Sequence, residues 1–166
     1  MSAYTRDMRF VDPTRDLWRP LPDDAAPSAH ALLTLRQWAA RRDSWPSSMP
    51  VGVIIDNAVD VEMLIDALPR LSLVALQFPK WTDGRAYSQA RLLRARLRYA
   101  GELRATGEVL VDMLPLLQRS GFDAVLMRAD QSVDAARRAL HFFAGHYQGD
   151  ALQPRPLFAR AAARAA

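Results

Sequence analysis

The sequence predicts an α/β fold, a single domain of repeated βα units with a mainly parallel sheet of about four or five strands. The length of 166 residues suits one domain with a full hydrophobic core. Short apolar runs alternate along the chain with segments of helical periodicity, which is typical of right-handed βαβ units. The pattern fits equally an open, Rossmann-like sheet and a sheet curled like half of a barrel.

Strands are expected where apolar and β-branched residues run without a polar break. Val51–Asp56 reads VGVIID and is bounded by Pro50 and Asn57, which indicates a buried strand. Ala31–Leu35 is a brief apolar run that fits a strand, or equally the start of a helix capped by Ser28. The other expected strands are Leu71–Phe78, the shorter and less apolar Glu102–Thr106, and Asp123–Arg128.

Helices are expected between these strands. In Asp60–Leu68 the apolar residues recur at helical spacing, and Pro69 ends the pattern. Val109–Arg119 is predicted as a helix that tolerates Pro115 and ends at Gly121. The remaining predicted helices are Arg36–Arg42 with Trp38 facing inward, Ser88–Ala100 and Ser132–Phe143.

Two segments flank the predicted α/β domain of residues 31–148. Residues 1–30 contain four prolines, so they are expected to form an irregular N-terminal arm in which Trp18 anchors the arm on the domain. Short extended pieces around Arg9–Val11 and Leu17–Leu21 fit a hairpin or an edge arm. Residues 149–166 are expected to be a flexible C-terminal tail.

Composition excludes several classes of protein. The chain has no cysteine, which removes disulfides, thiolate nucleophiles and cysteine-held metal or iron–sulfur sites. No apolar run approaches the ~20 residues of a membrane helix, and the N-terminus lacks the apolar core of a secretory signal. We therefore expect a cytoplasmic protein without membrane association. No cofactor can be named from the residues.

The cations are almost all arginine, with Lys80 the only lysine at a net charge of +4. Arginine binds carboxylates and phosphates with a planar fork, so this bias suits recognition of an anion or an acidic partner. A GC-rich genome, which also favours the Ala-rich end of the chain, is the simpler explanation.

The segment Phe78–Gly107 concentrates these charges after a predicted strand. On a helical wheel, Ala86, Ala90, Leu93 and Leu97 form a packing face. The opposite side of the helix is expected to be a solvated face or a docking surface for an acidic partner. Its residues are Tyr87, Arg91, Arg94 and Arg98.

The turn before this helix is a candidate anion site. Asp83 or Thr82 can cap the helix, and Gly84 allows close approach of a ligand to the backbone. Arg85 and Ser88 could complete such a site, although no GxGxxG or GxxxxGK[ST] pattern is present.

A second group of charges lies on and after the third predicted strand. Glu102, Arg104 and Glu108 could share a rim with Asp83 and Arg85. Carboxylates beside arginines can perform acid–base chemistry, but ion pairs that only fix a loop have the same sequence pattern, and we prefer that interpretation.

Other chemistries have little support in the sequence. The histidines His30, His141 and His146 show no metal-ligand spacing, and no GxSxG elbow of a hydrolase is present. Aromatic residues are not interleaved with the arginines, so only the high isoelectric point favours nucleic-acid binding. A homo-oligomer is compatible with the sequence.

The segments FPKWTDGRAYSQARLLRARLRYAGELRATGEVL and RSGFDAVLMR resemble a bacterial family of unknown function. Its typical motif runs close to FPxFtDGRgySxArlLRxRxgyxGElRAvGdvLxDQl and then RcGFDaf. The resemblance covers roughly residues 50–148. Four departures are Trp81 for phenylalanine, Arg98 for glycine, Met113 for the glutamine of DQL and Ser120 for cysteine, the last of which argues against an essential thiol there.

The resemblance implies a pathway, because members of this family are usually encoded beside the assimilatory sulfite reductase haemoprotein. The first hypothesis is an accessory protein that docks on the reductase, on its electron donor or on an anionic group. The second is an oxidoreductase of sulfite reduction with a bound organic cofactor, as many members are labelled. The third is a small-anion binder or sensor that uses the turn Asp83–Ser88.

Overall fold

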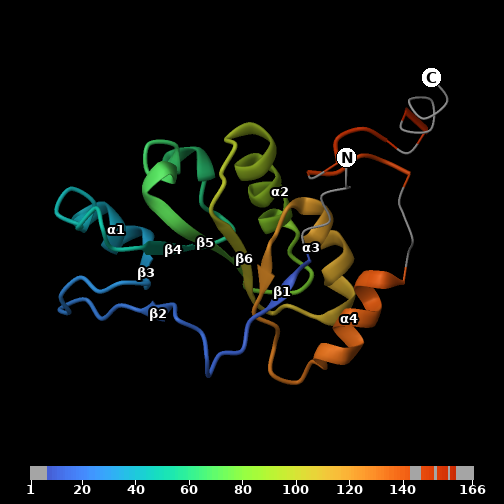
Figure 1. Ribbon diagram of the computed structural model, residues 1–166, viewed down its shortest axis with the longest axis horizontal. Coiled ribbons are helices and arrows are strands. Elements are labelled where there is room, and N and C mark those ends of the chain that lie inside the picture. Colours follow the sequence, from blue (N-terminus) through green and yellow to red (C-terminus); the bar gives the residue numbers. More distant parts are fainter. Residues whose placement is uncertain (1–6, 143–146, 152, 157, 160–166) are drawn as a thin grey trace.

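Seven parallel strands form one curled sheet in the order β1-β7-β6-β5-β4-β3-β2 (Figure 1). The computed structural model describes residues 7–142, 147–151, 153–156 and 158–159. The strands are β1 (Arg9–Phe10), β2 (Arg19–Pro20), β3 (Ala31–Thr34), β4 (Val51–Ile55), β5 (Leu71–Phe78), β6 (Glu102–Gly107) and β7 (Ala124–Val125). The predicted α/β class is confirmed in its half-barrel form. The strand count exceeds the prediction because the arm contributes β1 and β2, which are too short to show any periodicity.

The connection between β1 and β2 bridges the curled sheet. These strands stand at the two ends of the strand order, and residues 11–18 join them. Along the connection Asp16 pairs with Arg104 of β6, and the Trp18 ring packs against Gly52 of β4. Residues 11–18 therefore cross the concave face, and β1 and β2 do not form the hairpin that was considered.

Helices cover the convex face of the sheet (Figure 1). The α-helices are α1 (Leu35–Arg41), α2 (Arg85–Arg91), α3 (Leu114–Ser120) and α4 (Val133–His141). Thr34 and Gln37 form a capping box at α1, and Ser132 caps α4. Helix α3 ends at Gly121, whose φ of 100° is the left-handed conformation that glycine adopts without strain. This end was predicted.

Three predicted helices differ in detail. The segment 60–68 forms one short 3₁₀ helix, η1 (Val61–Leu64), followed by turns, and a second 3₁₀ helix, η2 (Leu68–Arg70), begins at its end with Pro69 in the first turn. The helix predicted at Val109–Arg119 starts as η4 (Val111–Met113), which places Pro115 in the first turn of α3, where its missing N–H costs nothing. The basic helix begins earlier than expected, and after Arg91 it continues as a π-helix, η3 (Leu92–Arg96).

The main core lies between the sheet and these helices. Phe78 at the end of β5 and Phe122 before β7 are fully buried, with ring centroids 6.0 Å apart. Each such side chain contributes about 1.5–3 kcal/mol through burial. Other fully buried residues of this core are Leu76, Leu93, Leu103, Leu114 and Leu117. The core thus fixes the carboxyl end of β5 and the start of α2, where the candidate turn lies.

Candidate functional site

The turn between β5 and α2 holds a closed pair of opposite charges. The Arg85 guanidinium donates to the Asp83 carboxylate at 3.0 Å from Nε and 2.7 Å from Nη2, and the Arg85 backbone N–H donates at 3.2 Å. These bonds hold the pKa of Asp83 well below its usual range. Because Arg85 already faces a carboxylate, and Asp83 occupies one free N–H of α2, the turn presents little unpaired positive charge.

Two buried amides lie beside this turn, and sequence reasoning missed both. Gln89 donates from Nε2 to the carbonyls of Asp56 and Val59, at 2.9 and 2.8 Å. Among the described residues, neither Gln89 Oε1 nor the Asn57 amide nitrogen has a partner with hydrogen-bond geometry. The only available signal was a glutamine on the otherwise apolar packing face of the helix.

The sequence predicts a packing face and an opposite, exposed face for the basic helix, and the structure confirms only the packing face in full. Ala86, Ala90 and Leu93 are fully buried and Leu97 is half-buried, so the packing face is confirmed. On the opposite side, Tyr87 is half-buried. Its ring makes an edge contact with Phe78 at 5.1 Å, and burial raises the pKa of its hydroxyl. Ser88 is exposed.

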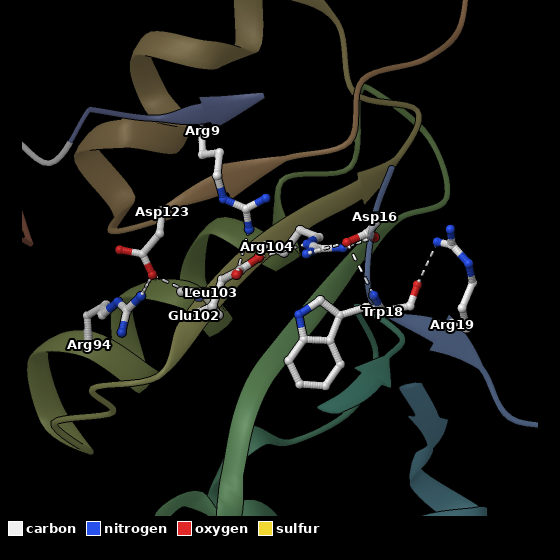
Figure 2. A network of polar contacts seen from close by, with 9 residues as sticks. All are labelled: Arg9, Asp16, Trp18, Arg19, Arg94, Glu102, Leu103, Arg104 and Asp123. Atoms are coloured by element: carbon white, nitrogen blue, oxygen red, sulfur yellow. Dashed lines mark hydrogen bonds and ion pairs between the residues drawn. The ribbon is translucent and has the colours of Figure 1, made fainter. Parts of the chain in front are cut away.

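Arg94 is turned inward, away from the stripe to which it was assigned. Its guanidinium donates to the carbonyls of Tyr99, Gly101 and Gly121, at 2.5, 2.8 and 2.9 Å. It also pairs with the carboxylate of Asp123, which accepts the backbone N–H of Leu103 at 2.9 Å (Figure 2). One side chain thereby joins η3 to the starts of β6 and β7, and this gives a structural reason for an arginine at this position.

Glu102 and Arg104 belong to a network on the concave face (Figure 2). Arg104 is 3% exposed and donates to Glu102 at 2.8 Å and to Asp16 at 2.5 Å. Arg9 of β1 pairs with the other Glu102 oxygen at 2.6 Å. Buried arginine with two carboxylates is well suited to fixing the arm across the sheet, because each charge is paired and hydrogen-bonded.

The predicted rim of Glu102, Arg104, Asp83 and Arg85 is wrong. Glu102 is the first residue of β6, whereas Asp83 follows the last residue of β5, and the two strands are parallel. The two groups therefore lie at opposite edges of the sheet. Glu108 does lie near the turn, since its backbone N–H donates to Phe78 at 2.8 Å, and its carboxylate pairs with Arg128.

Arg91 and Arg98 remain on the surface. Both are exposed, and neither has an ion pair with any residue that the structure describes. They line one wall of a cavity of about 690 Å³, with Arg94 and Ala95 between them. The other wall is the part of the chain around Tyr147–Ala151, Pro154, Pro156 and Phe158. Arg98 has a φ of 56°, a left-handed conformation that costs a non-glycine residue energy.

The other candidate groups that the structure describes form no metal cluster and no second polar network with the turn. In the described part of the chain, no cluster of three or more His, Asp or Glu side chains could hold a metal ion. His30 makes an edge contact with Trp18 at 5.2 Å, and His141 contacts the Arg137 carbonyl at 2.8 Å. His146 lies outside the described residues. No described helix has both the length and the apolar character needed to cross a membrane.

Comparison with protein families gives one match, to a bacterial protein family of unknown function, DUF934, over residues 52–158. The chain belongs to this family. No curated protein matches the chain. The matched region of this DUF934 protein begins in β4. It contains both the ion pair of Arg94 with Asp123 and the exposed arginines of the cavity, Arg91 and Arg98.

The structure explains several glycines of this DUF934 protein. Gly107 and Gly121 have φ values of 95° and 100°. A Cβ on Gly101 would lie 2.3 Å from the Tyr99 hydroxyl, which donates to the Leu71 carbonyl at 3.1 Å. Because these positions exclude a side chain, they serve the fold and give no evidence of a ligand.

Proposed function

We propose that this DUF934 protein is a cytoplasmic accessory protein of assimilatory sulfate and sulfite reduction that docks on an acidic partner. The observation that carries this proposal is the pair Arg91 and Arg98, exposed together on one wall of a cavity without a described carboxylate partner. Arginine forks match carboxylates, and charge complementarity of this kind sets the rate and orientation of encounter.

The pathway is supported by the family resemblance, since related proteins are encoded beside the sulfite reductase haemoprotein. The partner is therefore the haemoprotein or its electron donor. The docking surface contains fewer of the candidate arginines than the sequence suggested. Arg94 and Arg104 are buried in internal ion pairs, and Arg85 faces Asp83, so Arg91 and Arg98 are the arginines that supply charge to the partner.

The test is the affinity of the purified protein for the purified haemoprotein of the same bacterium, and for its electron donor, measured over a range of salt. Affinity should fall steeply between about 0.05 M and about 0.5 M salt, because surface charges are screened. Arg91→Glu should weaken binding at low salt by about tenfold or more. Arg96→Glu is the matched control, because Arg96 lies on the same helix, is exposed and does not line the cavity. Binding that is independent of salt, or equal loss in both variants, would refute the proposal.

A further inference from the structure

The cavity beside α2 and η3 combines two kinds of wall. On one side Arg91 and Arg98 supply positive charge. On the other side the rings of Tyr147 and Phe158 contact each other, with centroids 5.6 Å apart and planes inclined by 36°. Both aromatic residues remain largely exposed, at 70% and 60%. Two large rings are thus held together at the surface without being buried by the part of the chain that the structure describes.

The aromatic wall is attached to the domain by its own backbone. Ala151 donates to the carbonyl of Arg119 at the end of α3, at 3.0 Å. Asp150 donates to the Gln153 carbonyl at 2.9 Å and accepts the Gln153 N–H on its carboxylate, which closes a turn. The Ala151 side chain also lies next to Gly121, beside the Arg94 stem. These contacts place the rings opposite the arginines.

From this juxtaposition we propose that the cavity binds a nucleotide, that is, a planar aromatic ring joined to a phosphate group. A simple acid would leave the two rings unused, and an apolar ring alone would leave the two arginines unpaired. The volume of about 690 Å³ lies within the ~300–1,000 Å³ of ordinary ligand sites. Arginine binds phosphate through charge-assisted hydrogen bonds, and a base stacks on tyrosine or phenylalanine.

Arg98 adds an independent reason to assign binding to this wall. Its backbone is left-handed, with a φ of 56°, a conformation in which glycine is favoured. An arginine at this position therefore costs stability. Its side chain lines the cavity, so the charge it brings acts on whatever the cavity holds.

This inference rests on the same arginines as the proposed function and names the ligand class of that site, but it needs no partner protein. The probe is ADP, titrated calorimetrically into the purified full-length chain. Adenosine lacks the phosphates and pyrophosphate lacks the ring, so each should bind about tenfold or more weakly than ADP.

Variants locate the site. Arg91→Gln and Phe158→Ala should each weaken ADP binding by about tenfold, since one removes a charge-assisted bond and the other a stacking surface. Arg96→Gln, on the same helix but outside the cavity, should bind like the wild type. Circular dichroism and thermal unfolding of each variant confirm that the fold is retained, as expected for exposed residues.

The inference is overturned if ADP fails to bind more tightly than its two fragments, or if Arg91→Gln and Phe158→Ala bind it as Arg96→Gln does. Those outcomes leave the docking proposal standing, because its readout is affinity for the haemoprotein or its donor. Conversely, ADP binding that requires both walls, without salt-dependent docking, would support the nucleotide site and refute the docking.

Discussion

The guanidinium of Arg94 and the carboxylate of Asp123 form an ion pair in which only 7% and 17% of the two side chains are exposed. Around this pair, Arg94 also binds three backbone carbonyls, and Asp123 binds a backbone N–H of β6. The pair therefore provides hydrogen-bond partners for backbone groups at the edge of the sheet where β6 and β7 begin, next to η3. Its role is structural.

Breaking this pair should destabilise the protein strongly. Arg94→Met leaves the Asp123 carboxylate and the three carbonyls without their donor, so the free energy of unfolding should fall by about 3–5 kcal/mol. Urea unfolding followed by circular dichroism measures this. Arg96→Met, which removes an exposed pair with Glu62, should change stability by less than about 1 kcal/mol. Equal effects of the two substitutions would show that Arg94 is not a structural clamp.

Asp16 should hold the arm over the concave face. Asp16→Ala removes one of the two carboxylates that pair with the buried Arg104 and should cost about 2–4 kcal/mol. Hydrogen exchange should accelerate first in β1 and β2, because the connection between them loses its attachment to β6. Asp43→Ala, at an exposed carboxylate, is the control. If β1 and β2 exchange no faster in Asp16→Ala than in Asp43→Ala, Asp16 does not attach the arm to β6.

Replacing Arg98 by glycine should stabilise the fold. The left-handed backbone at φ 56° costs arginine about 1–2 kcal/mol, part of which is offset by the greater chain entropy of glycine. A net gain of about 0.5–1 kcal/mol in unfolding free energy is expected for Arg98→Gly. Arg98→Ala keeps the strained backbone and should gain little. If alanine and glycine stabilise equally, side-chain repulsion rather than backbone strain is the cause.

The pair Asp83–Arg85 should make the free energy of unfolding depend on pH in the acidic range. The folded-state pKa of Asp83 is lowered by its bonds to Arg85, so its contribution is fully present above the ordinary value of 3.8 and is lost as pH falls below that value. The stability difference between wild type and Asp83→Asn should be constant above about pH 5 and should shrink below pH 3.8. A difference that grows with acid would have the wrong sign for this pair.

Sequence alone predicted the fold class because β4 and β5 are long, apolar and bounded by Pro or Asn, and because Gly121 ends α3. The extended pieces expected around Arg9–Val11 and Leu17–Leu21 contain β1 and β2, which are edge strands of the sheet. The sequence could not show what they pair with, since a strand of two residues has no period to detect. It also joined α2 and η3 into one helix of uniform phase. The π-turn at Leu92–Arg96 shifts that phase, with the Leu97 N–H bonded to the Leu92 carbonyl at 2.9 Å.

The sequence predicted which residues belong to the candidate site, but it predicted their arrangement in space only in part. The helical wheel grouped Arg91, Arg94 and Arg98, but the long-range partner Asp123 draws Arg94 inward, and no local pattern reveals such a partner. Glu102 was predicted correctly as the first residue of its strand but was grouped with the wrong edge of the sheet. In a parallel sheet the start of β6 and the segment after β5 lie at opposite edges. Of the two aromatic residues in the cavity wall, Phe158 lay in the segment 149–166 that was expected to be a tail, and Tyr147 lay just before it.

The central claim is that Arg91 and Arg98 bind an acidic partner protein, whereas their neighbour Arg94 stabilises the fold through its internal ion pair with Asp123. The most direct measurement is the low-salt affinity of the double variant Arg91→Gln/Arg98→Gly for the sulfite reductase haemoprotein and for its electron donor. Arg98→Gly relieves strain and Arg91 is exposed, so the variant stays folded. We predict a loss of about tenfold or more in affinity for the partner that the wild type binds. An unchanged affinity in this folded variant would contradict the account.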